Sequence, residues 1–232
     1  MIIVYFCGGK LLLVLIFKLQ YVKLNKKDSK KGASRNMNIN NNKKLILIAS
    51  PPACGKTTLA KKLAAALGNV AYIDKDALNP FGKQICRLCS HEYDPDSEFF
   101  VKEVREIEYE VTMSMAYEAL EYANTVIVNA PFGKEIRDTE YMSGVKRAAE
   151  AQGAEVILVF IMANAELCRI RMTARGSIRD VHKLENWEEY VKGVNFTAPT
   201  ELENIITLYL YHNDTPAQDK QSMNELMTLL GK

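Results

Sequence analysis

Residues 45–67 read LILIASPPACGKTTLAKKLAAAL, and this stretch decides the fold. The first five residues, 45–49, are apolar and have the right length for a short buried strand. Residues 59–67 repeat apolar side chains at helical spacing, and the loop between the two segments ends in Gly-Lys-Thr. That tripeptide alone is common in surface turns. A strand before it and a helix after it are the context of a phosphate-binding P-loop.

The loop predicts how a nucleotide would be held. Backbone N–H groups of a P-loop converge on an anion, and the N-terminus of the following helix adds partial positive charge. Lys56 is predicted to reach the outer phosphates and Thr57 to coordinate Mg²⁺. Ser50 stands where the motif G-x-x-x-x-G-K-[ST] has its first glycine, which costs backbone freedom but removes no phosphate donor. The predicted nucleotide-binding residues are Ser50, Pro51, Pro52, Ala53, Cys54, Gly55, Lys56, Thr57 and Thr58.

The composition predicts one folded domain without a general affinity for nucleic acids. The 232 residues are 48% hydrophobic and 25% charged, which suffices to bury one core. The formal net charge of +2 is unevenly distributed, because residues 1–36 hold eight Lys and Arg against one acid, whereas residues 37–232 hold 22 against 27. The part expected to fold is therefore mildly acidic.

Five cysteines are scattered along the chain, at positions 7, 54, 86, 89 and 168. An odd and dispersed set in a chain of this length is typical of reduced thiols and not of a disulfide framework. Cys86 and Cys89 resemble half of a zinc site, but no second pair follows them, so we interpret them as structural thiols. We therefore expect a cytoplasmic protein.

Residues 1–24 are apolar but are interrupted by three lysines, which leaves runs too short to span a bilayer. The segment also lacks the cationic start and the cleavage site of a signal peptide. Three interpretations remain: a weak membrane anchor, a disordered tail, or translated upstream sequence with the true start at Met37. Apolar runs this short favour a tail or translated upstream sequence over a membrane anchor. We expect residues 1–43 to form a tail or linker and residues 44–232 the folded domain.

A second predicted strand, residues 70–73, ends in Asp74-Lys-Asp76. A carboxylate at the carboxyl end of a strand in an open α/β sheet points into the ligand crevice. We interpret Asp76 as a general base that takes the proton of an attacking hydroxyl. The alternative is an ordinary aspartate that caps the next helix.

A third predicted strand, residues 125–129, ends at Asn129, where P-loop proteins usually carry an aspartate that supports Mg²⁺ through water. An asparagine can orient such a water but adds no negative charge. No glutamate stands beside it to activate a water for hydrolysis. The sequence therefore favours transfer to an organic hydroxyl over hydrolysis.

An arginine-rich segment follows the predicted helix 165–175. Arg171 and Arg175 lie four residues apart and share a helix face. Arg175 and Arg179 are candidates for a lid, because guanidinium groups stabilise the charge of a transferring phosphoryl group and Gly176 gives mobility. The alternative is a solvated basic helix that pairs with nearby glutamates.

Periodicity predicts the remaining elements. Helices are expected over residues 94–123, 135–152, 183–192 and 222–230, and further strands over residues 155–161 and 204–211.

With the P-loop, Asp74-x-Asp76, the Ala-Pro-Phe segment 130–132 and Arg175…Arg179-Asp180 in place, residues 44–232 resemble the P-loop kinases. More narrowly, they resemble the AAA_33-type ATP-binding proteins, which are grouped near the zeta toxins, chloramphenicol phosphotransferase and the polynucleotide kinases. The resemblance implies a three-layer α/β P-loop NTPase fold with a five-stranded parallel sheet in the order 2-3-1-4-5 and a short arginine-bearing lid. It also implies ATP and Mg²⁺ at the strand ends.

By resemblance, Asp76 matches the general base, and Arg175 and Arg179 match lid arginines. Several relatives hold an acidic or phosphorylated substrate with an Arg or Lys three residues after the base, but this chain has Asn79 there. Lys56, Asp76, Arg175 and Arg179 are thus the predicted catalytic residues. Thr57 and, through water, Asn129 are the predicted metal-binding residues.

These residues predict ATP- and Mg²⁺-dependent phosphoryl transfer to a small hydroxylated acceptor by a monomer or dimer. One alternative is a non-catalytic or weakly hydrolytic ATP-binding regulator, which Asn129 and Asn79 favour. Another is a nucleic-acid end kinase, which the acidic charge of residues 37–232 disfavours. A membrane partner is expected only if residues 1–24 are expressed and act as an anchor.

Overall fold

The computed structural model describes residues 6–7, 10–11, 43–177 and 180–232. The predicted tail, residues 1–43, and the alternative start at Met37 thus lie almost entirely outside the described residues. The described chain divides into two compact units, one that includes residues 78–107 and one that includes residues 43–77 and 108–232. Near the N-terminus, β1 (Phe6–Cys7) pairs with β2 (Lys10–Leu11) in antiparallel fashion.

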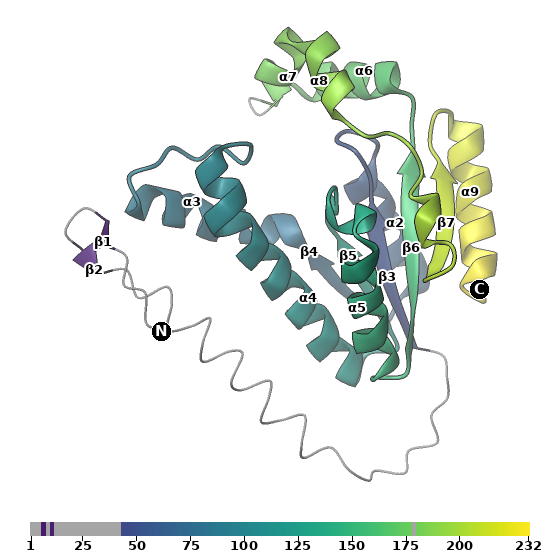
Figure 1. Cartoon of the computed structure of the whole chain (residues 1–232). Coiled ribbons are helices and arrows are strands. Elements are labelled where there is room, and N and C mark those ends of the chain that lie inside the picture. The colour runs from purple at the N-terminus through teal and green to yellow at the C-terminus, as the bar shows by residue number, and fades with distance from the viewer. Residues whose placement is uncertain (1–5, 8–9, 12–42, 178–179) are drawn as a thin grey trace. The chain divides into compact units, whose positions relative to one another are not determined.

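The larger unit is built on a five-stranded sheet in the order β4-β5-β3-β6-β7 (Figure 1). All four strand pairs are parallel. If only the five strands of this sheet are numbered along the chain, with β3 as the first, their order in the sheet is 2-3-1-4-5. This order confirms the predicted fold class. The strands are β3 (Lys43–Ala49), β4 (Ala71–Asp74), β5 (Thr125–Asn129), β6 (Ala154–Met162) and β7 (Thr207–His212).

Helices cover both faces of this sheet, so its central strands are apolar on both sides. Leu45 and Leu47 point to the face covered by α4 (Arg105–Tyr122) and α5 (Thr139–Glu150). Ile46 and Ile48 point to the opposite face, which is covered by α2 (Lys56–Leu67) and α9 (Pro216–Leu229). All four of these strand side chains are fully buried. The resulting three layers are visible in Figure 1.

Helix caps explain where two helices differ from the sequence prediction. The helix expected over 135–152 begins at Thr139, after a 3-10 turn (Glu135–Arg137), because the extended Asp138 accepts a hydrogen bond from Tyr141 N at 3.0 Å. The helix expected to begin at residue 222 begins at Pro216, because Thr215 and Gln218 form a reciprocal capping box.

Two other predicted segments also differ. The single helix expected over 183–192 is two short helices, α7 (Val181–Glu185) and α8 (Trp187–Gly193), because Asn186 between them leaves the helical conformation. The last strand begins at Thr207, since a 3-10 turn (Thr200–Leu202) and a further turn occupy the residues before it. The helix α6 (Ala165–Arg175) has the predicted bounds.

The smaller unit contains α3 (Asn79–Leu88) and one turn of π-helix (Phe100–Val104). Its core is formed by Cys86, Phe100 and Val104. Cys86 is thus a buried packing residue, as expected for a structural thiol. Over the described residues, none of the helices combines the length and the apolar character needed to cross a bilayer.

Candidate nucleotide and phosphoryl-transfer site

The predicted P-loop leaves the carboxyl end of β3 and enters α2 at Lys56. Ala53 and Gly55 adopt left-handed conformations, with φ of 63° and 99°. Ser50 has no positive φ, is buried, and donates its hydroxyl to Pro51 O at 2.8 Å. A serine is therefore compatible with the turn where the motif has its first glycine, because this turn does not need glycine's conformational freedom.

The P-loop is attached to α6 and to the end of β7 through the carbonyl oxygen of Cys54. This oxygen accepts hydrogen bonds from Asn213 Nδ2 at 2.6 Å and from Arg171 Nη1 at 3.2 Å. Arg171 also donates from Nη2 to Asn213 O at 2.8 Å. Sequence reasoning placed Arg171 only on a shared helix face with Arg175. The structure shows that it joins the predicted P-loop to the end of β7 by hydrogen bonds.

Gly55 is required at its position for two reasons. Its φ is strongly positive, and a Cβ added to it would lie 2.5 Å from Asn213 Nδ2. We expect Gly55→Ala to cost about 1–3 kcal/mol through strain and thereby weaken nucleotide binding about tenfold or more. Titration of the variant with ATP in the presence of Mg²⁺ measures the effect.

Gly68→Ala is the matched control for Gly55→Ala. Gly68 also has a positive φ, 77°, but a Cβ there meets nothing within 4 Å. The control therefore carries the conformational strain without the clash against Asn213, and it lies at the other end of α2. Equal ATP affinity in the two variants would show that the contact with Asn213 does not shape the loop.

Asn129 connects the P-loop to the neighbouring strand β4. The residue is almost completely buried, with 1% of its surface exposed. Its Oδ1 accepts a hydrogen bond from Lys56 Nζ at 3.1 Å, and its Nδ2 lies 3.3 Å from Thr57 Oγ1. The same Nδ2 donates to Asp74 Oδ2 at 2.9 Å. The amide therefore joins the predicted phosphate and metal ligands to a carboxylate.

Asp74 belongs to this site, although sequence reasoning assigned a role only to Asp76. Asp74 and Asn129 are register partners at the ends of β4 and β5. Tyr72 OH donates to Asp74 Oδ2 at 3.0 Å. Burial and the neighbouring Asp74 carboxylate raise the pKa of Tyr72 to about 12, so the phenol keeps its proton at neutral pH. The signal in the sequence was that both strands end in a polar residue.

Asp76 lies in the 3-10 turn η1 (Lys75–Leu78) that follows β4. Its backbone N–H donates to Asp74 Oδ1 at 3.0 Å, and its side chain is exposed. Asp74 therefore holds the turn that carries Asp76, and the carboxylate of Asp76 is accessible to a substrate.

Lys75, between the two aspartates, points away from this network into the protein. Its ammonium group is ion-paired with Glu108 Oε2, and the two side chains are only 9% and 5% exposed. It also lies 5.6 Å from the centre of the Tyr109 ring. Tyr109 OH in turn accepts a hydrogen bond from Phe132 N at 2.9 Å. These buried contacts fix the segments that follow β4 and β5.

The predicted lid arginines are only partly described. Arg175 ends α6 and forms a two-point ion pair with Asp180, through Nε and Oδ2 and, at 2.7 Å, through Nη2 and Oδ1. The carboxylate of Asp180 is buried, so this pair joins the two ends of the segment 176–179. Arg179 lies outside the described residues. The roles of both arginines in catalysis remain predictions.

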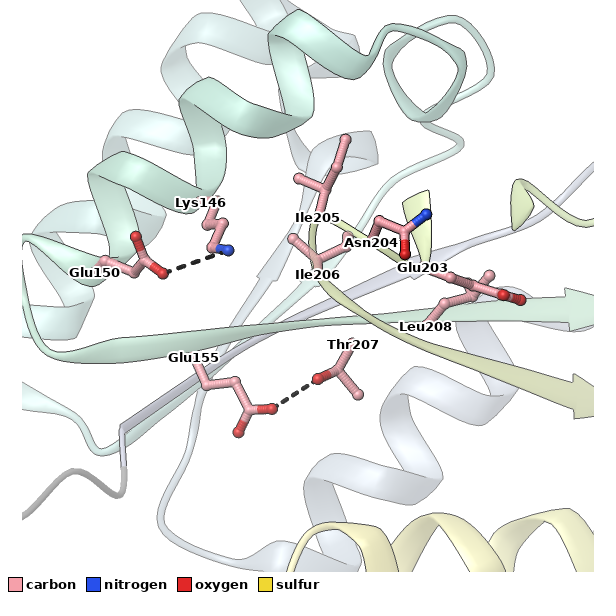
Figure 2. Close-up of a pocket in the computed structure, with 9 residues that line it drawn as sticks. All are labelled: Lys146, Glu150, Glu155, Glu203, Asn204, Ile205, Ile206, Thr207 and Leu208. Atoms are coloured by element: carbon pink, nitrogen blue, oxygen red, sulfur yellow. Dashed lines mark hydrogen bonds and ion pairs between the residues drawn. The ribbon is translucent and has the colours of Figure 1, made fainter. Parts of the chain in front are cut away.

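A depression of about 480 Å³ lies at the end of the sheet away from the P-loop, next to the amino ends of β6 and β7 (Figure 2). Four of its polar side chains form two pairs: Glu155 Oε1 accepts from Thr207 Oγ1 at 2.7 Å, and Lys146 lies 3.7 Å from Glu150. The P-loop follows the carboxyl end of β3. The depression is therefore separate from the candidate nucleotide site.

Comparison with known proteins identifies the family and the fold. A family model described as an AAA domain (AAA_33) matches residues 45–195. The chain belongs to this family, and its fold is that of the P-loop kinases. None of the curated proteins matches the chain.

Solved structures with the same fold include small-molecule kinases. A sugar kinase from Janibacter sp. HTCC2649 is 15% identical, with a TM-score of 0.53 over 82% of this chain and 95% of its own. A gluconokinase from Sinorhizobium meliloti 1021 is 12% identical, with a TM-score of 0.52 over the same shares. A structure from the PezAT toxin–antitoxin system of Streptococcus pneumoniae is 16% identical, with a TM-score of 0.50 over 93% and 97%. At such identities the likeness establishes the fold alone.

Proposed function

We propose that the protein transfers the γ-phosphoryl group of ATP to a hydroxyl group of a small organic acceptor. One observation carries the proposal: Asn129 bonds to Lys56 of the P-loop and to Asp74, and Asp74 holds the backbone of Asp76. The groups expected to bind ATP and the candidate base thus belong to one hydrogen-bonded network at adjacent strand ends. The similarity in fold to sugar and gluconate kinases supports this reading.

The P-loop would hold the triphosphate through its backbone amides, with Lys56 on the outer phosphates. Phosphoryl transfer requires little covalent participation by the protein, so catalysis would rest on positioning and charge stabilisation. The hydrogen bond from Lys56 Nζ to Asn129 Oδ1 supports this role, because it orients the ammonium group without neutralising it. Arg179 would add positive charge, and Arg175, the last residue of α6, would do so once it exchanged its ion pair with Asp180 for a phosphate oxygen.

The donors at the site fit Mg²⁺, which prefers oxygen ligands and is usually bound through one or two carboxylates together with substrate phosphates. Thr57 Oγ1 and the Asp74 carboxylate are both hydrogen-bonded to Asn129, which brings a hydroxyl and a carboxylate together. Thr57 would bind the ion directly, and Asp74 and Asn129 would hold its water ligands. When bound, the ion would neutralise charge on the phosphates.

Asp76 would accept the proton of the acceptor hydroxyl. Its side chain is exposed, and its backbone is held by Asp74. A carboxylate that is accessible but fixed at its backbone suits this task, because a general base must come within hydrogen-bond reach of the proton that it removes.

The proposal is tested by a product search. The protein is incubated with ATP, Mg²⁺ and a mixture of sugars, cyclitols, amino acids and nucleosides, and mass spectrometry detects species that gain one phosphoryl group. Lys56→Ala serves as the control. We expect one class of phosphorylated product, absent with Lys56→Ala. Tight ATP binding without any product would overturn the proposal in favour of the regulator. A product only on oligonucleotide ends, lost at high salt, would instead indicate an end kinase.

A further inference from the structure

Two buried thiols with no role in the proposed chemistry meet at the P-loop. Cys54 lies in the loop between Ala53 and Gly55, and Cys168 lies on α6. Their sulfur atoms are 3.5 Å apart, and both residues are fully buried. The two cysteines are 114 residues apart in the sequence, so the fold alone brings them together.

We propose that Cys54 and Cys168 form an oxidation-sensitive dithiol, and that its conversion to a disulfide by hydrogen peroxide closes the P-loop to nucleotides. The proposal rests on nucleotide binding by the loop and not on phosphoryl transfer.

The distance between the thiols is close to that needed for a bond. A disulfide has an S–S length of about 2.05 Å, so the two sulfur atoms must approach by about 1.5 Å. Cys168 belongs to a regular helix, whereas Cys54 belongs to a loop. The loop is therefore expected to provide most of the movement.

Movement of Cys54 would alter the anion-binding geometry of the loop. Its two neighbours hold left-handed conformations, and its carbonyl oxygen is bound by Asn213 and Arg171. A bond to Cys168 would pull on a backbone that these contacts already fix. The amides that follow would then no longer converge on one phosphate group, and ATP affinity would fall.

The chemistry balances with one peroxide per disulfide. The Cys168 thiolate attacks a peroxide oxygen, the O–O bond breaks, and the hydroxide that leaves takes the proton released by the thiol, which gives a sulfenic acid and water. The Cys54 sulfur then attacks the sulfenic sulfur, the S–S bond forms, and the second water leaves with the Cys54 proton. The two thiols lose two electrons and the peroxide gains them.

The surroundings favour Cys168 as the attacking thiolate. The hydrogen bond with Cys54 and the nearby Arg171 guanidinium lower the pKa of Cys168, whereas burial and the Asp214 carboxylate oppose this shift. The pKa of Cys54 is raised by the same hydrogen bond and by burial. Because both residues are buried, peroxide must enter as the loop opens. Bound ATP, which would hold the loop closed, is therefore expected to slow the oxidation.

The test uses the full chain, treated with hydrogen peroxide with and without ATP and then freed of peroxide. Peptide mass spectrometry is expected to find Cys54 linked to Cys168. Titration with ATP and Mg²⁺ is expected to show at least about tenfold weaker binding, which dithiothreitol restores. Cys168→Ala and Cys168→Ser should bind ATP before treatment and keep that affinity after it, whereas Cys86→Ala should remain as sensitive as the wild type.

Three results would overturn the proposal. One is the lack of a linked peptide from the folded, treated wild type. Another is a linked peptide with unchanged ATP affinity. The third is a treated Cys168 variant that loses affinity as the wild type does. None of these readouts depends on phosphoryl transfer, so the outcome is distinguishable from a failure of the proposed kinase activity.

Discussion

Replacing Asp76 with asparagine is expected to lower the rate of phosphoryl transfer about 10²–10⁴-fold, the usual contribution of a general base. Asparagine has the same shape but cannot take a proton from the acceptor hydroxyl. ATP affinity should not change, because the exposed side chain of Asp76 makes no hydrogen bond to the P-loop in the described structure. ADP release with the identified acceptor measures the rate, and titration with ATP measures the affinity.

Asp138→Asn is the matched control for this variant. It makes the same chemical change in the same unit, at the N-cap of α5, where asparagine caps a helix as well as aspartate does. Its turnover should equal that of the wild type. Normal turnover by Asp76→Asn would show that another group removes the proton.

Replacing Lys75 with methionine is expected to destabilise the fold by about 3–5 kcal/mol, because it leaves the Glu108 carboxylate buried without its ion partner. Glu108 Oε1 already lacks a hydrogen-bond partner, and Oε2 would lose the ammonium group. The double variant Lys75→Met/Glu108→Leu should recover most of the loss, since it removes both charges. Urea denaturation of the three proteins measures the free energy of unfolding.

The exposed ion pair between Lys62 and Asp219 provides the control. Its side chains are 46% and 33% exposed, so Lys62→Met should cost no more than about 1 kcal/mol. Equal losses for Lys62→Met and Lys75→Met would contradict the view that the buried pair anchors the segment carrying Asp76.

The P-loop could be predicted from the sequence because its signals are local. A short apolar strand, Gly-Lys-Thr and a helix are contiguous, and the structure has β3 and α2 at those positions. The sheet order came from the resemblance to P-loop kinases, since periodicity does not say which strands are neighbours. The break at Asn186 between α7 and α8 was missed because the apolar spacing continues across it.

The contacts that organise the site depend on strand register and could not be predicted in this way. Asp74 and Asn129 are 55 residues apart in the sequence and meet only because β4 pairs with β5. Arg171 reaches the P-loop across 117 residues, whereas the sequence placed it only on a helix face shared with Arg175. Lys75, between two aspartates, has the pattern of a solvated charge, yet its side chain is buried against Glu108.

Calorimetric titration of the folded protein with ATP and Mg²⁺ tests the central claim, which is that the P-loop and Lys56 together bind the triphosphate of ATP. We predict saturable binding at one site, weakened at least about tenfold by Lys56→Ala through the loss of a charged hydrogen bond. A folded wild-type protein that takes up no ATP, or a Lys56→Ala variant that binds it as tightly, would contradict the account.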